Sequence, residues 1–222
     1  MKKKHAFTLI ELLVVISIIA ILVAMLAPTL ASVMEKGRAR DCLNNLRTLG
    51  LGITSFQADS KDTMFAKDAT GEEVWPKLLH RNYVKDWKSF RSVFDKVTPS
   101  RRNTQDEPVP ISYGLNSQIF DTFAGKWNTP ISSLIMAAPA IDTSSAETVA
   151  FKSDAFSTNN VMLLNAGTGG NYGTHSKRNL INVLYADGHV AEQEYTKYSD
   201  IATERGKAQW DPFYEKADQQ QQ

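Results

Sequence analysis

The chain of 222 residues has only one cysteine, Cys42. A single cysteine cannot form an intramolecular disulfide, so small disulfide-stapled scaffolds are excluded. Any folded domain must therefore be held together by its hydrophobic core. The part of the chain available for such a domain is long enough, since about 160 residues can bury sufficient apolar surface.

The chain also lacks an excess of charge of either sign. Its 25 Lys and Arg residues nearly balance 24 Asp and Glu residues, which gives a formal net charge of +1. No stripe of Lys and Arg interleaved with aromatic residues occurs. A nucleic-acid partner is therefore not expected.

Sequence motifs of common catalytic and metal sites are missing as well. No serine lies in Gly-x-Ser-x-Gly, and neither EF-hand spacing nor His-Glu-x-x-His occurs. The glycine-rich segment 167–170 is not followed by the Lys-Ser/Thr and helix of a P-loop. Cys42 lies in an apolar stripe, which argues against a nucleophile. We expect no catalytic residues, no enzymatic activity and no cofactor.

One long apolar run is present, at the N-terminus. Within residues 9–26 only Glu11 and Ser17 carry polar side chains, and three lysines, at positions 2–4, precede the run. A helix of about 20 apolar residues can span a hydrocarbon core of about 30 Å, and the lysines stay on the cytoplasmic side. An ionised Glu inside a membrane costs about 2.5–3.5 kcal/mol on insertion scales, so Glu11 needs a partner or a function.

A basic flank followed by an apolar run is also typical of an ordinary secretory signal peptide. Such a peptide would be cut beyond the apolar region, near residues 24–27, and would release a secreted enzyme or binding protein. The run here is longer than usual signal-peptide cores, and it opens with Glu11. Both interpretations stay open at this point.

The lysine-rich start and the sequence Phe-Thr-Leu-Ile-Glu at residues 7–11 resemble the leader of type IV prepilins and type II secretion pseudopilins. The resemblance implies that a prepilin peptidase cuts between Ala6 and Phe7 and methylates the new Phe7 amine. The family usually has Gly where this chain has Ala6. The resemblance further implies that Glu11 pairs with the Phe7 amine of a neighbouring subunit. Pro28 lies where pilins commonly place a proline, which kinks or locally melts a helix.

The apolar pattern continues beyond the membrane segment with steps of three and four residues. This spacing predicts an amphipathic helix, so that residues 7–59 form one rod whose second half packs on a globular domain. A coiled coil with a second chain is the competing explanation. Three glycines are expected to weaken the middle of the helix. The stripe consists of Ala39, Cys42, Leu46, Leu49, Ile53 and Phe56, and the glycines are Gly37, Gly50 and Gly52.

After residue 59 the sequence predicts short elements joined by loops. Trp75 and Pro76 start a helix, because proline fits the first turn. Asp187 and Gly188 form a two-residue turn of a β-hairpin. The remaining predictions are strands at 112–116, 147–151 and 180–185, a returning strand at 189–193, an apolar segment at 131–139 and a charged loop at 98–110.

The segment from His175 to Gly188 resembles a C-terminal motif of pseudopilin-like proteins, in which a His precedes Asp-Gly by about nine residues. Here eleven residues separate His175 from Asp187. We expect structural roles, with the His175 side chain bonded to a backbone group and Asp187 in the turn. A less favoured alternative is that His175, Asp187, His189 and Asp154 converge on zinc, manganese or calcium.

Together these features predict an α+β fold with a long N-terminal helix packed on a small antiparallel β-sheet domain. The expected divisions are a leader at 1–6, a membrane and assembly half-helix at 7–29, an amphipathic half-helix at 30–59 and a periplasmic domain at 60–222. The resemblance implies a single-pass inner-membrane protein with a cytoplasmic N-terminus, which assembles into a filament in the periplasm or at the cell surface.

The function that the resemblance implies is a structural subunit of a type II secretion pseudopilus. The alternative is a type IV major or minor pilin for adhesion, motility or DNA uptake. The single cysteine favours the pseudopilin, because many major pilins close a C-terminal loop with a disulfide. The implied partners are a prepilin peptidase and methyltransferase, identical or homologous subunits, an inner-membrane assembly platform and membrane lipid.

Overall fold

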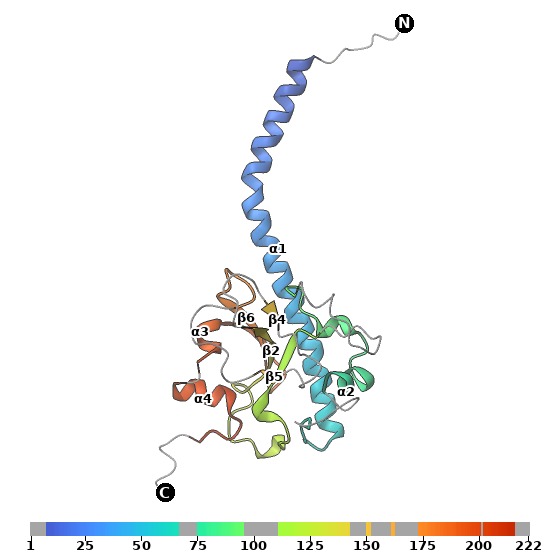
Figure 1. Cartoon of the computed structure of the whole chain (residues 1–222), viewed down its shortest axis with the longest axis vertical. Coiled ribbons are helices and arrows are strands. Elements are labelled where there is room, and N and C mark those ends of the chain that lie inside the picture. The colour runs from blue at the N-terminus through green and yellow to red at the C-terminus, as the bar shows by residue number, and fades with distance from the viewer. Residues whose placement is uncertain are drawn as a thin grey trace. The chain divides into compact units, whose positions relative to one another are not determined.

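The computed structural model describes residues 8–66, 75–95, 111–142, 150–151, 161–162, 173–200 and 202–215 (Figure 1). The chain forms two compact units, Met1–Gly37 and Arg38–Gln222, and helix α1 (Leu9–Asp59) contributes residues to both. Four sequence predictions lie outside the described residues: the loop at 98–110, the glycine-rich segment 167–170, Asp154 and the Ala6–Phe7 cleavage site.

The first unit contains the N-terminal part of α1, which confirms the predicted long helix. Pro28 lies inside α1, where it has no N–H to donate to the carbonyl oxygen of Ala24. The chain nevertheless stays helical from Leu9 to Asp59. Of the two expected effects of Pro28, local melting is not observed, because one missing hydrogen bond does not stop a helix of this length, and the kink stays a prediction.

The second part of α1 packs through the predicted apolar stripe. Cys42, Leu46 and Ile53 have no exposed surface. The hydroxyl of Tyr113 donates a hydrogen bond to Cys42 Sγ at 3.3 Å, and burial raises the pKa of the Cys42 thiol. A buried thiol that keeps its proton is a poor nucleophile, which agrees with the assigned packing role.

The glycines of this part of α1 permit close packing. A Cβ atom at Gly50 would lie 2.8 Å from Leu184 Cδ1, and one at Gly52 would lie 2.6 Å from Val84 Cγ2. The helix is uninterrupted at both positions. Glycine lets neighbouring side chains approach the helix backbone at these two positions, and this packing offsets its low helix propensity. The expected weakening of the middle of the helix stays a prediction.

A five-stranded sheet forms the centre of the second unit, in the order β5-β1-β2-β6-β7. Strands β1, β2, β6 and β7 pair antiparallel, which confirms the predicted sheet, whereas β5 pairs parallel to β1. A second, two-stranded sheet joins β3 to β4, and β4 is the described part of the strand predicted at 147–151. The strands are β1 (Tyr113–Asn116), β2 (Ile135–Pro139), β3 (Ile141–Asp142), β4 (Ala150–Phe151), β5 (Val161–Met162), β6 (Leu180–Tyr185) and β7 (Val190–Glu194).

The five-stranded sheet lies between two layers of helices (Figure 1). Successive side chains of a strand point to opposite faces. In β6, Leu184 therefore packs in the cluster that contains α1, while Ile181 and Val183 pack with Trp210 on the other face. The first layer holds α1 and α2 (Trp75–Asn82), as predicted from Trp75 and Pro76, with the 3₁₀ turn η2 (Trp87–Phe90); the second holds α3 (Tyr195–Tyr198) and α4 (Glu204–Trp210).

Two further 3₁₀ turns, η4 (Ser117–Ile119) and η5 (Ala124–Lys126), follow β1. The side chain of Asn116 caps η4 by accepting a hydrogen bond from Gln118 N at 3.0 Å. Asn116 has no exposed surface, and its Nδ2 donates to the carbonyl oxygens of Ile135 (2.9 Å) and Trp210 (2.8 Å). One buried amide thus joins β1, β2 and the end of α4.

The β6–β7 hairpin is confirmed, but its loop differs from the expected two-residue turn. Gly188 N donates to Tyr185 O at 3.0 Å, and Tyr185 N donates to His189 O at 2.9 Å, so three residues close the loop. Gly188 has φ +86°, the left-handed conformation that ends such loops. The prediction was wrong because Asp-Gly is typical of two-residue turns and also supplies the left-handed glycine of three-residue loops.

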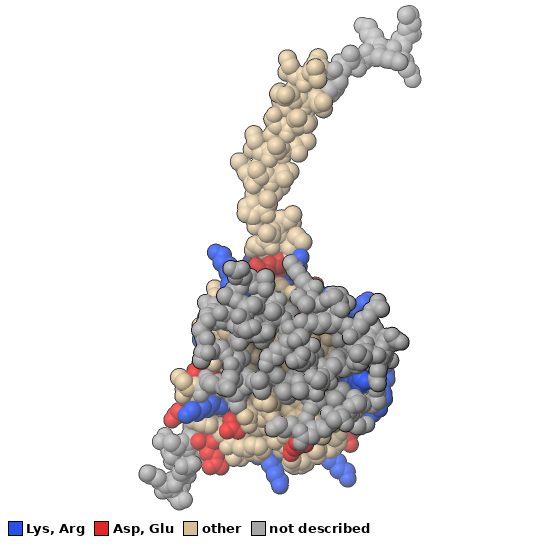
Figure 2. Space-filling model, in the orientation of Figure 1, with Lys and Arg blue, Asp and Glu red and all other residues tan. Residues whose placement is uncertain are grey.

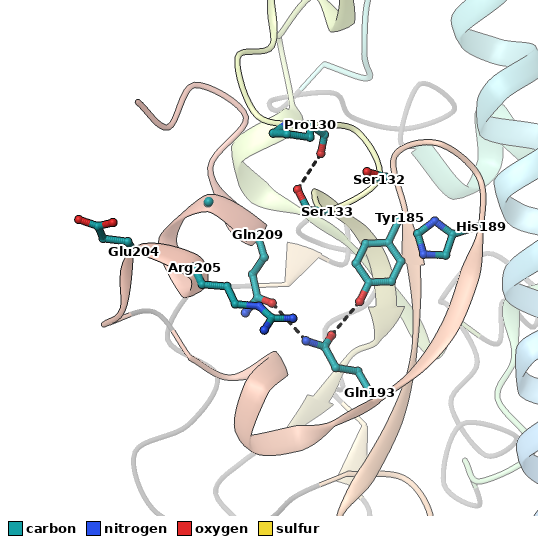
Figure 3. Close-up of a pocket in the computed structure, with 10 residues that line it drawn as sticks. Pro130, Ser132, Ser133, Tyr185, His189, Gln193, Glu204, Arg205 and Gln209 are labelled. Carbon is teal, nitrogen blue, oxygen red and sulfur yellow. Dashed lines mark hydrogen bonds between the residues drawn. The ribbon is translucent and has the colours of Figure 1, made fainter. Parts of the chain in front are cut away.

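A pocket of about 530 Å³ opens beside β6, β7 and α4 (Figure 3). Its wall includes Tyr185 from β6, Gln193 from β7, and Arg205 and Gln209 from α4. These residues come from three elements that the hairpin and the Trp210 cluster hold together, so the pocket belongs to the folded core of the second unit.

Candidate functional site

The N-terminal part of α1 presents an apolar surface to its surroundings. Every Leu, Ile and Val from Leu9 to Val33 has between 46% and 86% of its surface exposed. This segment is almost free of charged atoms on the face drawn in Figure 2. By length and composition, α1 can cross a membrane, and none of its most apolar stretch is buried. An apolar surface of this size needs lipid or protein around it, so the segment is suited to membrane anchoring.

The Glu11 side chain caps the first turn of this helix. Its Oε2 accepts hydrogen bonds from Thr8 N and Thr8 Oγ1, both at 2.8 Å, and Glu11 N donates to Thr8 Oγ1 at 3.2 Å. This reciprocal arrangement is a capping box, which satisfies backbone donors that the first helical turn leaves free. The sequence signal was Thr-x-x-Glu before an apolar run, and sequence reasoning assigned Glu11 no capping role.

The Glu11 carboxylate is the one ionisable group between Leu9 and Met34. The described structure gives its Oε1 no hydrogen-bond partner, whereas Oε2 has two from Thr8. Two other polar side chains of the segment bond to the helix itself: Ser17 Oγ donates to Leu13 O at 2.7 Å, and Thr29 Oγ1 donates to Leu26 O at 2.8 Å. Glu11 is thus the charged group of this surface that can still bind a partner.

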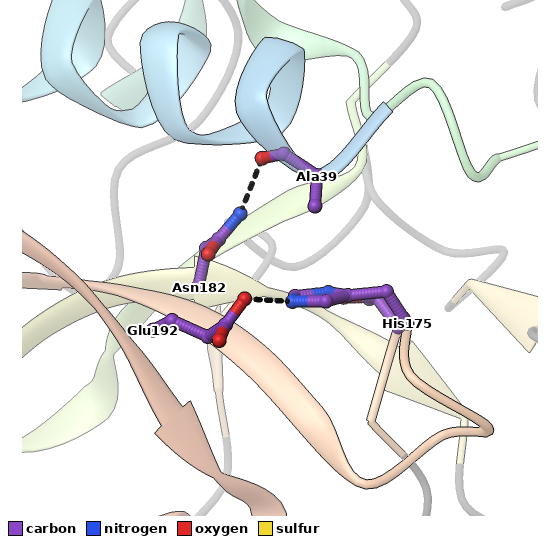
Figure 4. Close-up of polar contacts among 5 residues, drawn as sticks. Ala39, His175, Asn182 and Glu192 are labelled. Carbon is purple, nitrogen blue, oxygen red and sulfur yellow. Dashed lines mark hydrogen bonds and ion pairs between the residues drawn. The ribbon is translucent and has the colours of Figure 1, made fainter. Parts of the chain in front are cut away.

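His175 lies in the segment before β6, and only 4% of its surface is exposed. Its Nε2 lies 2.7 Å from Glu192 Oε2 (Figure 4). Its Nδ1 lies 2.9 Å from Thr174 Oγ1. The ring also stacks on Phe94, with 5.8 Å between centroids. The expected bond to a backbone group is wrong, because both ring nitrogens contact side chains.

Glu192 was not identified from the sequence. It sits in β7 directly opposite Asn182 of β6, so the two side chains share one face of the sheet. Asn182 Nδ2 donates to Ala39 O of α1 at 2.7 Å (Figure 4). His175, Glu192 and Asn182 therefore link the segment before β6 to the hairpin and the hairpin to the second part of α1.

Asp187 and His189 pair with each other within the hairpin loop. Asp187 Oδ1 accepts from His189 N at 3.1 Å and lies 2.5 Å from His189 Nδ1. Partial burial raises the pKa of Asp187, but the hydrogen bonds from His189 outweigh this and hold it below its ordinary value. The His189 ring stacks on Tyr185, with 4.3 Å between centroids. Gly188 supplies the backbone conformation that brings the pair together.

These candidate residues have different partners in the described part of the chain. His175 contacts Glu192, whereas Asp187 contacts His189. No group of three or more His, Cys, Asp or Glu side chains arranged to hold a metal ion occurs among the described residues. The geometry supports two local pairs that stabilise the fold around β6 and β7.

Residues 1–27 match the family described as the prokaryotic N-terminal methylation motif. No curated protein and no solved structure matches the chain. The matched segment includes the lysine-rich start, Glu11 with its cap and the first part of the exposed apolar surface. Together with the long apolar helix and the α+β architecture, this motif is consistent with a type IV pilin-like protein.

Proposed function

We propose that this chain is the precursor of a structural subunit of a type II secretion pseudopilus. The observation that carries the proposal is the methylation motif at residues 1–27, which runs directly into a helix with an exposed apolar surface and one capped carboxylate. Pilin-like proteins with this motif are structural subunits and not enzymes. The proposed role is accordingly structural.

Processing is the first step of the proposed function. A prepilin peptidase cuts between Ala6 and Phe7 on the cytoplasmic side of the inner membrane and methylates the new Phe7 amine. Thr8 keeps its amide N–H after this cut, because Phe7 still precedes it. The Thr8–Glu11 cap can therefore form in the processed chain as well.

Assembly then transfers the apolar part of α1 from lipid into a bundle of neighbouring helices. The transfer changes apolar burial little, since lipid tails and packed helices are similarly apolar. Specificity must come from a polar contact, and a carboxylate in hydrocarbon strongly favours a cationic partner. In the proposed filament, Glu11 Oε1 receives the Phe7 amine of the next subunit while Thr8 holds Oε2, and an inner-membrane assembly platform drives the process.

The proposed topology is single-pass, with a cytoplasmic N-terminus and residues 60–222 in the periplasm. A type II secretion role is preferred over a type IV pilus because the chain has one cysteine, and Cys42 is fully buried in the described fold. A C-terminal disulfide loop of the kind many major pilins carry cannot form within this chain.

The processing step is tested by mass spectrometry of the mature N-terminus from native membranes. The expected product begins at Phe7 and carries one methyl group. A start beyond Ala24 would show an ordinary signal peptide and reject the filament proposal, and an uncut Met1 would leave only a membrane anchor.

The assembly step is tested by filament recovery with Glu11→Ala and Glu11→Gln. The Gln side chain retains an oxygen that Thr8 can cap but carries no charge, so both variants are expected to lose filaments while remaining in the membrane. Glu35→Ala, which removes the next carboxylate along α1, is the matched control and is expected to assemble. Filaments formed normally by Glu11→Gln would contradict the amine pairing. Retention of an exported protein in a deletion strain, without loss of surface pili, separates secretion from a type IV pilus.

A further inference from the structure

The pocket beside β6, β7 and α4 has a wall of neutral polar groups fixed by a chain of hydrogen bonds. The Tyr185 hydroxyl donates to Gln193 Oε1 at 3.1 Å, and Gln193 Nε2 donates to Gln209 Oε1 at 3.2 Å (Figure 3). Gln209 Nε2 in turn donates to Lys197 O at 2.7 Å. Each amide is thereby held in one orientation, which is how binding sites present donors and acceptors without further ordering.

Oxygen atoms along this wall can accept further hydrogen bonds. Ser133 Oγ donates to Pro130 O at 2.9 Å, so its lone pairs are available as acceptors. The same holds for the Tyr185 oxygen, since the hydroxyl proton is directed to Gln193. The wall is therefore suited to a ligand that brings hydroxyl groups.

Arg205 supplies the positive charge of the pocket, whose wall also includes the carboxylate of Glu204. It precedes Gln209 by one helical turn on α4, so both side chains lie on the same face of the helix. Figure 3 shows the guanidinium extending toward Gln193 and Gln209, whereas the carboxylate of Glu204 points away from them. Burial raises the pKa of Tyr185 and the positive charge of Arg205 opposes this rise, as expected for two groups that face one space.

The Arg205 guanidinium forms no ion pair with the described residues. Among the described residues, no carboxylate lies within ion-pair distance of Arg205, and the ion pairs of this region join His189 to Asp187 and Lys197 to Glu194. Arginine binds carboxylates through two parallel hydrogen bonds, which makes it the preferred side chain for this group.

We propose that this pocket binds a small hydroxylated carboxylate, of the class of sugar acids. Arg205 binds the carboxylate, and Tyr185, Ser133 and Gln193 bind the hydroxyl groups. The volume of about 530 Å³ lies within the range of about 300–1,000 Å³ typical of small-molecule sites. The site is separate from the Glu11 surface, so its occupancy does not depend on the proposed filament role.

The test is a saturation-transfer NMR titration of the full processed chain in micelles of an uncharged, sugar-free detergent. Galacturonate is the probe, galactose lacks the carboxylate, and cyclohexanecarboxylate lacks the hydroxyl groups. Galacturonate is expected to bind at least about tenfold more tightly than either control compound. Equal binding of galactose would overturn the carboxylate assignment, and equal binding of cyclohexanecarboxylate would overturn the hydroxyl assignment.

Variants of α4 locate the site. Arg205→Met is expected to weaken galacturonate binding about ten- to hundredfold, and Arg205→Lys, which keeps the charge without the planar fork, is expected to weaken it less. Lys207→Met removes an exposed charge from the same helix and is expected to bind as the unmodified chain does. Thermal unfolding of each variant verifies that the domain is folded. Unchanged binding by a folded Arg205→Met chain would overturn the proposal.

Discussion

Replacement of Asn116 by alanine tests how the sheet is joined to α4. The Asn116 side chain is fully buried, and it makes three hydrogen bonds to backbone groups of Gln118, Ile135 and Trp210. An alanine side chain can make none of them. Two buried carbonyl groups, of Ile135 and Trp210, and the partly buried N–H of Gln118 would then lose this partner.

The expected magnitude follows from the number of bonds. A buried hydrogen bond contributes about 1 kcal/mol net, so three bonds suggest a loss of about 3 kcal/mol in the free energy of unfolding. A change of 1 kcal/mol shifts the unfolding temperature by about 2–4 °C in a domain of this size, so a decrease of roughly 6–12 °C is expected. Asn116→Asp is expected to be at least as destabilising, because a carboxylate oxygen would face two carbonyl oxygens.

The assay is thermal unfolding of the full chain in detergent micelles, followed by the near-ultraviolet signal of its aromatic residues. Asn128→Ala is the matched control, because Asn128 Nδ2 donates to Glu215 Oε1 at 3.1 Å in an exposed bond. That control is expected to change stability by less than about 0.5 kcal/mol. If the two alanine variants unfold at the same temperature, Asn116 does not connect the sheet to α4 as argued.

Two further predictions concern packing and the buried histidine. Gly52→Ala is expected to destabilise the domain by about 1 kcal/mol, because overpacking against Val84 outweighs the gain in helix propensity. In Gly37→Ala the added Cβ meets no atom within 4 Å, so this control should be neutral or stabilising. Equal urea midpoints of the two variants would contradict this prediction. His175→Ala is expected to cost about 2–3 kcal/mol in the same urea assay, through lost hydrogen bonds and ring packing. Glu192→Ala should cost less than about 1 kcal/mol, since 48% of its side chain is exposed, and a larger loss there would refute this ranking.

Regular elements of this protein were predictable because they leave a periodic pattern. The apolar run and the spacing of Leu46, Leu49 and Ile53 predicted α1, and the Asp-Gly dipeptide after an apolar strand predicted the β6–β7 hairpin. Both follow from interactions between residues close in sequence. The length of the hairpin loop was missed, since the dipeptide fits more than one loop geometry.

Contacts between distant polar residues were not predictable in the same way. His175 meets Glu192 because β7 pairs with β6 in one register, and a shift of one residue would turn Glu192 to the other face. The Asn116 bonds to Ile135 and Trp210 likewise depend on the final packing. By contrast, the capping of α1 by Thr8 and Glu11 could have been predicted from the sequence Thr-x-x-Glu. It was missed because Glu11 was interpreted only as a carboxylate inside a membrane segment.

Some polar groups of this protein have bonding partners within the fold, and others can still bind a partner from outside it. His175 and Asp187 are bound by Glu192 and His189, which explains them as parts of the framework around β6 and β7. The Glu11 carboxylate accepts hydrogen bonds through one oxygen only, Oε2. Arg205 faces a pocket and has no carboxylate partner among the described residues. A charged group whose binding capacity is left open is a better candidate for recognition than one already paired. The two available groups differ in sign and lie in different parts of the chain, so the proposed assembly through α1 and the proposed binding beside α4 can be tested independently.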